Sequence, residues 1–277
     1  MGKIKKAIYY TILKSKSKIK GKTMKEIIKL TTLMLTLLLF TACVRSGGSD
    51  DNTTDISQDT DVTAETETET TAASITHNGT TYGFVTSPYT GKVWLDRNLG
   101  AAQVCTSFDD TACYGDYYQW GRNFDGHEDS MSGTTTTQAT DVTSVGHGDF
   151  IINDNGRRDW ASVDATGATR MANWSKTDGS SVCPVGFRVP SFEELKAETL
   201  DNGVTNRDTA FSNFLALPSA GYRYSGLGTF SRQGLRGYVW TSSVNGSYSY
   251  FVGLDSDILG FRNGIRASAI SVRCLKD

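Results

Sequence analysis

Hydrophobic and polar positions divide the chain into three stretches of different pattern. Leu30–Phe40 is an unbroken run of eleven apolar or Thr residues. Residues 44–74 contain eight acidic residues, one Arg and no aromatic residue. From Ile75 to Asp277, short apolar segments alternate with turns rich in Gly, Ser and Thr. Only this last stretch can bury a sizeable core, so we expect one globular domain over residues 75–277.

Strand and turn signals dominate that domain. His77-Asn78-Gly79 precedes Thr80–Val85 and is typical of a tight hairpin turn. A further strand is expected to start within Gly91–Leu95. Three more strands are expected at Gly237–Thr241, Tyr248–Leu254 and Ser268–Leu275.

Helical patterns are few and short. Ser191–Lys196 begins with a capping residue, continues with two Glu in the first turn and places two apolar residues three positions apart. Asp208–Leu217 predicts a second helix, with three apolar residues on one face. Asp125–Trp174 has no such pattern and is expected to consist of loops. The expected fold class is therefore α+β, with short helices, small antiparallel sheets and long loops.

The apolar run near the start predicts export. It is too short to cross a bilayer, which needs about 20 residues, and it follows Lys25 and Lys29, as in a secretory signal. Its end, Thr41-Ala42-Cys43, resembles the lipobox of bacterial lipoproteins, although Phe40 stands where Leu is usual. By that resemblance residues 1–43 are a signal segment, and Cys43 becomes the lipidated residue that anchors the protein in the bacterial cell envelope, at the outer membrane or cell surface. The alternative is a general signal peptide whose cleavage site contains a Cys.

The charge distribution narrows the choice of partners. The chain has 28 Lys and Arg against 30 Asp and Glu, but ten of the Lys lie in residues 1–30. After residue 42 there remain 18 basic and 29 acidic residues, a net charge of −11. Nucleic acid is therefore not an expected partner, because its binding needs basic side chains on phosphates. The acidic, Thr-rich residues 44–74 are expected to form an extended disordered linker.

Four Cys follow Cys43, at positions 105, 113, 183 and 274. An even number in an exported domain predicts disulfides, and three pairings are possible. We favour Cys105 with Cys113 and Cys183 with Cys274. The alternative is a four-thiolate metal site, but no two of these Cys have CxxC spacing. No metal and no cofactor are therefore expected.

Two other candidate metal patterns are weak. His127-Glu128 is followed by Met131 where a zinc protease needs His. An Asn- and Asp-rich run does not fit the EF-hand register, although it contains candidates for irregular calcium binding. A turn-rich surface loop is the preferred interpretation of that run. The candidates are Asp149, Asn153, Asp154, Asn155 and Asp159.

A series of motifs in residues 80–277 resembles one bacterial family. The motifs are Val93–Ala101, Tyr114–Arg122, Asp125-Gly126-His127, Gly146-His147-Gly148, Cys183–Ser191, Leu217–Arg223, Trp240–Ser243 and Ser271–Lys276. In this order they are similar to the Fibrobacter succinogenes major paralogous domain. The resemblance implies a C-type-lectin-like fold with close termini, two helices, a small antiparallel sheet and long loops.

Two departures from related families bear on activity. The Glu-Pro-Asn, Gln-Pro-Asp and Trp-Asn-Asp motifs of calcium-dependent lectins are missing. The reactive Cys pair that formylglycine-generating enzymes carry near the C-terminus is also missing, because only Cys274 lies there. We therefore do not expect an enzyme.

Ser242–Ser268 is the best candidate for a binding surface. Sixteen of its 27 residues are Ser, Tyr, Asn, Asp or Gly, a mixture typical of antibody paratopes. In proteins of the resembling fold this stretch often forms the ligand face, and in some it is rewritten by diversity-generating retroelements. An ordinary polar surface segment is the alternative. The residues predicted to bind a ligand are Trp240, Asn245, Tyr248, Tyr250, Asp255, Asp257, Arg262, Asn263 and Arg266.

Three functions remain open after these arguments. The favoured one is a surface-tethered recognition or adhesion protein that binds a protein or a glycan. The second is a passive structural protein of the envelope, and the third is an enzyme related to the formylglycine-generating group.

Overall fold

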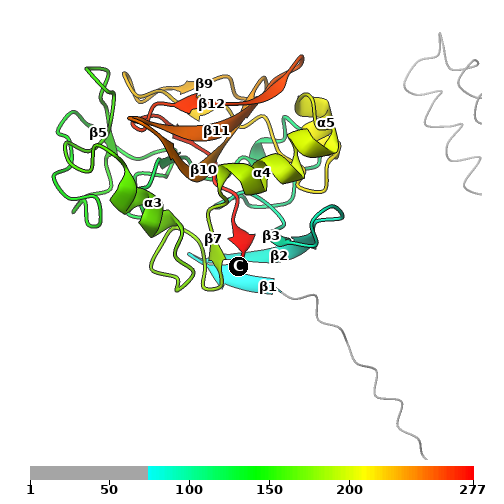
Figure 1. Cartoon of the computed structure of the whole chain (residues 1–277). Helices are drawn as coiled ribbons and strands as arrows, with labels where there is room; N and C mark the ends of the chain where they lie inside the picture. The colour runs from blue at the N-terminus through cyan, green and yellow to red at the C-terminus, as the bar shows by residue number, and fades with distance from the viewer. Residues whose placement is uncertain (1–73) are drawn as a thin grey trace, which may run out of the picture. The chain divides into compact units, whose positions relative to one another are not determined.

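The computed structural model describes residues 74–277. The predicted signal segment with Cys43 and the predicted linker to residue 73 lie outside the described residues. Within residues 74–277, no helix is both long and apolar enough to span a membrane. The described part is sheet-rich, with a few short helices and small, mostly antiparallel sheets, which confirms the expected α+β class (Figure 1).

One sheet contains both the first and the last strand. β1 (Ser74–His77) and β2 (Thr80–Thr86) form the predicted hairpin, in which Asn78 and Gly79 adopt the positive φ of 47° and 78° that a tight turn needs. β3 (Val93–Leu95) pairs with β2, and the sheet continues through β14 (Leu275–Lys276) to β7 (Phe187–Arg188). The described termini therefore lie on one sheet, at the bottom of Figure 1.

A second sheet holds the predicted binding segment. β10 (Gly237–Asn245) pairs with β11 (Tyr248–Leu254), and β11 pairs with β12 (Leu259–Gly264). β12 was not predicted, because its two Gly and its polar Arg-Asn pair interrupt the alternation of apolar and polar residues that is typical of a strand. Its strand conformation comes from pairing with β11 along its whole length.

The remaining strands are short. β4 (Tyr118–Gln119), β13 (Ala269–Ile270), β8 (Tyr222–Arg223) and β9 (Phe230–Ser231) form a third sheet. β5 (Thr134–Thr135) and β6 (Phe150–Ile151) form a parallel pair. The expected strand Ser268–Leu275 is split between β13 and β14, because the carbonyls between them accept hydrogen bonds from separate segments. Ser271 accepts from Trp240 and Val272 from Leu99.

Three α-helices and two 3₁₀ turns occur in the described part. α4 (Phe192–Glu198) is the predicted first helix, capped by Ser191 with Glu194 as its reciprocal partner. α5 (Arg207–Ser212) is shorter than predicted, because the backbone turns extended at Asn213, before the last apolar residues of the pattern. α3 (Ala168–Trp174) was not predicted, and it makes three helices where the resemblance implied two. The 3₁₀ turns are η1 (Thr111–Cys113) and η2 (Leu200–Asn202).

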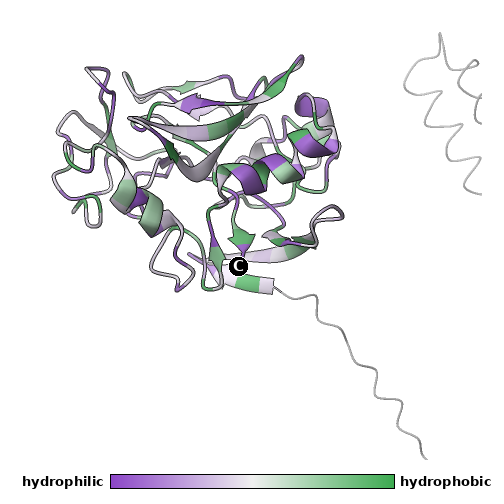
Figure 2. Cartoon of the chain, in the orientation of Figure 1, coloured by the Kyte–Doolittle hydropathy of each residue, from purple (hydrophilic) through white to green (hydrophobic). Residues whose placement is uncertain are grey.

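The core has an apolar layer on each side of the β10–β11–β12 sheet. On one side Val239, Val252 and Leu254 pack with Leu195 of α4. On the other side Trp240 packs with residues of the third sheet. Both α4 and α5 carry hydrophilic and hydrophobic residues along their length (Figure 2), as expected of helices that cover a sheet and face solvent.

Buried arginines organise the long loops. Arg122, Arg170, Arg223, Arg266 and Arg273 are each at most 4% exposed. Arg122 donates to the carbonyls of His147 and Asp149, and Arg223 donates to those of Gly228 and Ser132. Because buried carbonyls need partners, these side chains replace the backbone ladder that the loops lack.

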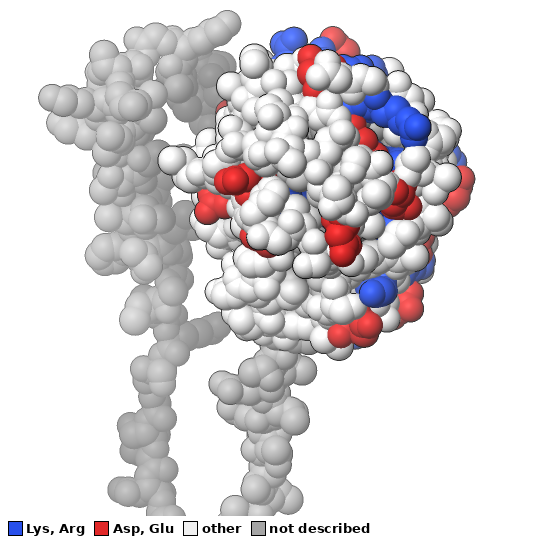
Figure 3. Space-filling view, turned by 90° about the vertical axis from the view of Figure 1, so that its left-hand side faces the viewer, with Lys and Arg blue, Asp and Glu red and all other residues white. Residues whose placement is uncertain are grey.

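The face that these loops build is mostly uncharged. Figure 3 shows it from the left-hand side of Figure 1, and acidic and basic side chains appear there in small separate groups. The small number of charged groups on this face is consistent with the burial of several arginines inside the domain.

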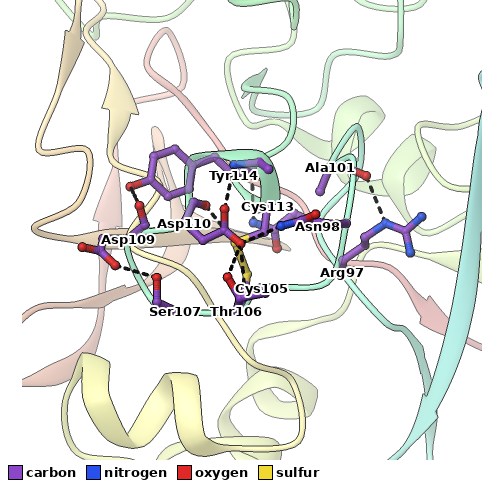
Figure 4. The surroundings of a disulfide bond; sticks show 12 residues. Arg97, Asn98, Ala101, Cys105, Thr106, Ser107, Asp109, Asp110, Cys113 and Tyr114 are labelled. Atoms are coloured by element: carbon purple, nitrogen blue, oxygen red, sulfur yellow. Dashed lines mark hydrogen bonds between the residues drawn. A yellow bond between two sulfur atoms is a disulfide. The ribbon is translucent and has the colours of Figure 1, made fainter. Parts of the chain in front are cut away.

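The structure contains the two predicted disulfides. Cys105 bonds to Cys113, and Cys183 bonds to Cys274. In the short loop, the Asp110 carboxylate accepts from the amide and hydroxyl of Thr106 (Figure 4). It also accepts from the side chain of Gln103 and the amide of Ala112. These hydrogen bonds lower the pKa of Asp110 to about 2. The Cys183–Cys274 bond links the segments that lead into β7 and β14, the two neighbouring strands of the first sheet.

Candidate functional site

The nine predicted binding residues do not form one surface. Asn245, Tyr248 and Asn263 gather at one end of the β10–β11–β12 sheet, where Asn245 Nδ2 lies 2.7 Å from Asn263 Oδ1. Asp255 and Asp257 lie at the other end, in the β11–β12 turn. The Asp255 carboxylate accepts from the backbone amides of Asp257 and Ile258, so it shapes that turn.

Two of the nine are buried, and the prediction for Arg266 is wrong. Arg266 is fully buried and donates to Asp159, Ser249 and four backbone carbonyls. It holds the β10–β11 turn against the loop before α3 and cannot meet a ligand. Trp240 is 1% exposed and donates its indole N–H to the carbonyl of Tyr118, so its role is mainly structural.

Tyr250 and Arg262 lie on opposite sides of the sheet. The ring of Tyr250 packs 4.8 Å from that of Phe192, on the side covered by α4. Arg262 is exposed and stands opposite Phe251 in the β11–β12 register. Directly opposite residues of an antiparallel pair share a side, so Arg262 and Phe251 face away from α4.

An aromatic pocket opens on that side, away from the helices. Its volume is about 270 Å³, and it lies where the β10–β11–β12 sheet meets β8 and β13. Strand alternation explains the lining, because Val239 and Val252 point toward α4 while their neighbours point the other way. The aromatic lining residues are Tyr222, Tyr224, Tyr238, Trp240 and Phe251, and Asn263 also borders the pocket.

The rings in the pocket form a continuous row. Tyr222 and Tyr238 are 5.4 Å apart between ring centroids, Tyr238 and Phe251 are 5.6 Å apart, and Phe251 and Trp240 are 5.9 Å apart. All three pairs are edge to face, the favoured geometry for aromatic contacts. Gly264 makes the row possible, since a Cβ there would lie 2.3 Å from the Trp240 ring.

Exposed arginines surround the pocket. Arg232 and Arg236 lie near Tyr238, and Arg262 stands beside Phe251. Burial raises the pKa of Tyr238, and the neighbouring Arg236 and Arg232 oppose that rise. Arg236 has one carboxylate partner, with its Nε 3.5 Å from Asp255 Oδ2. The pocket thus combines half-buried aromatic rings with a positively charged rim.

No family model, curated protein or solved structure matches the chain. The function must therefore be argued from the site itself.

Sequence reasoning missed most of the pocket. It included Trp240, Asn263 and the flanking Arg262, but not Tyr222, Tyr224, Tyr238 or Phe251. A signal was present in the spacing, because Tyr222 and Tyr224 are two residues apart, as are Tyr238 and Trp240. In strands such pairs point to one side, which predicts an aromatic face.

A cluster of Asp125, His127 and Glu128 has the composition of a metal site, with its possible ligand atoms within 4.8 Å of one another. Its atoms already have protein partners. His127 Nε2 accepts from the Gln119 amide, and Nδ1 lies 2.7 Å from Asp125 Oδ1. Glu128 accepts from the amides of Asp125 and Gly126. The cluster therefore orders its own loop.

Four of the calcium candidates, Asn153, Asp154, Asn155 and Asp159, line one hollow of about 660 Å³, but their carboxylates form no metal-binding cluster among the described residues. Asn153 Oδ1 accepts from the Asn155 amide, as in an Asx turn. Both Asp159 oxygens are bound by Arg170, at 2.6 and 2.9 Å. The Asn153 contact agrees with the turn-rich loop interpretation, whereas Asp159 is only 6% exposed and belongs to an internal ion pair.

A second, smaller pocket of about 250 Å³ lies beside the β1–β2 turn. Asp116 lines it and accepts a hydrogen bond from the Tyr118 hydroxyl. Burial, and secondly the charge of Glu128, raise the pKa of Asp116 to about 7. This carboxyl group is therefore half protonated near neutral pH.

Proposed function

We propose that the protein is a recognition lipoprotein of the bacterial cell surface. Its residues 75–277 act as a C-type-lectin-like binding domain, and residues 44–74 act as a spacer after lipidated Cys43. The main support for a binding role is the aromatic pocket. Ligand-binding sites are commonly lined by partly exposed aromatic residues, and the tyrosines of this pocket are half-buried.

Several features support the proposed fold and location. The motif series from Val93 to Lys276 supports the lectin-like assignment, together with the sheet shared by the first and last described strands. Two disulfides within one domain are typical of an oxidising, extracytoplasmic compartment. The apolar run that ends at Cys43 supports the lipid anchor.

The test is a binding screen with the full-length protein in detergent against arrays of glycans and cell-surface proteins. A pocket variant carries Tyr222→Ala and Tyr238→Ala, and a control carries Asn245→Ala and Tyr248→Ala at the β10–β11 turn. We expect the pocket variant to lose about tenfold or more in affinity for the bound ligand, as removal of central aromatic contacts does. The control should retain binding, and both variants should keep their melting temperature.

Two results would contradict the proposal in different ways. Loss of binding in the control with normal binding by the pocket variant would move the site to the β10–β11 turn. Absence of binding to every member of both arrays would favour the structural role in the envelope.

A further inference from the structure

The charged rim points to a specific ligand class for the aromatic pocket. We propose that the pocket binds an anionic saccharide, with a sugar ring against the aromatic row and its acidic group at Arg262 and Arg236. This inference rests on the proposed recognition function and names the ligand for the same site.

The walls suit a sugar ring. Tyr222, Tyr238 and Phe251 are each half-buried, so part of every ring remains open to a ligand. Pyranose rings present C–H groups on their faces and hydroxyl groups at their edges. The aromatic rings can cover the first, and the hydroxyl groups of Tyr222 and Ser268 at the pocket can hydrogen-bond the second.

The sheet provides a flat strip beside the row. Gly253 and Gly260 are directly opposite each other in β11 and β12. The rings of Phe251 and Tyr238 lean over Gly253, within 3.6 Å of where a Cβ would be. At Gly260 no atom lies within 4 Å of that position, so the strip is open there. A ring lying on this strip would have Arg262 two residues further along the same strand.

The charge at the rim is a local exception. Residues 74–277 contain 21 acidic and 17 basic residues, and five of the arginines are buried. Arg232, Arg236 and Arg262 are all exposed, whereas Asp255 is the one carboxylate paired with them in the described part of the chain. The Tyr224 hydroxyl at the pocket also donates to Asp154, but Arg158 lies 3.7 Å from that carboxylate and offsets its charge. The three exposed arginines therefore outweigh Asp255, so the rim attracts anions. The planar guanidinium group binds carboxylate and sulfate groups through two parallel hydrogen bonds.

The experiment compares acidic saccharides with their neutral counterparts. Oligosaccharides that contain galacturonate, glucuronate or sialate are titrated into the full-length protein in detergent by calorimetry. Each is paired with its carboxyl-reduced form, and sulfated forms of the neutral chains are added to separate the two sources of charge. We expect at least one acidic chain to bind at least about tenfold more tightly than its neutral counterpart, and its affinity to fall as salt is raised.

Matched variants locate the charge effect. Arg236→Gln with Arg262→Gln should weaken binding of the acidic chain by about tenfold or more and leave the neutral counterpart unchanged. Arg157→Gln with Lys176→Gln removes the same charge from exposed positions outside the pocket and should change neither affinity.

Four outcomes would overturn this inference. Equal affinity for acidic and neutral chains, or an unchanged affinity in the Arg236/Arg262 variant, would show that the rim does not recognise the anion. If no acidic chain binds while the array screen finds a neutral glycan or a peptide that depends on Tyr222 and Tyr238, the recognition function stands and the ligand class is wrong. If neither assay finds a ligand, both proposals fail.

Discussion

At the scale of single residues, arginine has two separate roles in this domain. Five arginines are buried and donate to carbonyls or carboxylates of the long loops. Three others stand exposed around one aromatic pocket. Arg262 and Arg266 are only four positions apart, yet they belong to different groups because Asp159 pairs with Arg266 from far away in the chain.

Asp116 makes stability depend on pH. Its pKa is about 7 in the folded protein and about 3.8 as a reference for the unfolded chain, so the folded state binds the proton more tightly. Stability should therefore fall as pH rises from about 4 to 7 through this group. Asp116→Asn removes the titration while keeping an acceptor for Tyr118, so the variant should gain a few degrees in melting temperature relative to wild type over that range.

Thermal melts of both proteins from pH 4.5 to 8 measure the difference. Asp257→Asn, at an exposed position in the β11–β12 turn, serves as the control and should follow the wild type. Parallel curves for wild type and Asp116→Asn would show that the carboxyl group titrates normally.

The same scale shows why the binding residues were only partly predictable. Composition identified Ser242–Ser268, and that segment does form two adjoining hairpins. It did not show which side chains face solvent, because exposure depends on segments far away in the sequence. Phe192 of α4 covers Tyr250, and the loop before α3 encloses Arg266.

At the scale of elements, the sequence predicted turns and helix caps correctly, because these backbone conformations require particular residue types. The Asn78-Gly79 turn and the Ser191 cap both formed as predicted, because positive φ and free helix amides are local needs. β12 and α3 have no comparable signal. They depend on tertiary contacts, such as the pairing of β12 with β11 and the ion pairs of Arg170 in α3.

The α4 capping box offers a test at this scale. Ser191 Oγ accepts from the Glu194 amide, and Glu194 Oε2 accepts from the Ser191 amide. Ser191→Ala should lower the free energy of unfolding by about 1 kcal/mol, the usual cost of losing such a cap. Urea denaturation measures the change, and Ser256→Ala in the exposed β11–β12 turn is the matched control, expected to have little effect.

A null result would have a specific meaning. Arg188 also binds both Glu194 oxygens, at 2.7 and 2.8 Å, and holds the pKa of Glu194 well below its usual range. If Ser191→Ala leaves stability unchanged, this ion pair rather than the cap would fix the start of α4.

At the scale of the whole molecule, the two disulfides should contribute unequally. Cys183 and Cys274 are 91 residues apart, whereas Cys105 and Cys113 are eight apart. In the chain-entropy model the long loop is worth about 4–5 kcal/mol and the short one about 2–3 kcal/mol. The double Ser variant of the long pair should therefore lower the melting temperature more than that of the short pair, as calorimetry can measure. Equal losses would indicate that effects in the folded state outweigh loop closure.

The even number of cysteines predicted disulfides but left three pairings possible, of which the favoured one is observed. The arrangement of the sheets was not predictable. The pocket arises only because β8, β10 and β13, which are distant in sequence, meet at one place. No local sequence pattern predicts contacts between strands that are so far apart in the chain.

The position of β1 has a mechanical consequence. The rest of the chain enters the domain at Ser74, and β1 is an edge strand held by β2 alone within its sheet. Ser74 lies at the open end of that hairpin, and the β10–β11–β12 sheet lies at the opposite end of the molecule in Figure 1. If the N-terminus is anchored and the pocket holds a ligand, as proposed above, a pulling force between them would load the β1–β2 hydrogen bonds one after another. The β1–β2 hairpin would therefore open before the sheet strands that the Cys183–Cys274 bond links. Opening of this hairpin would limit the force that reaches the rest of the domain.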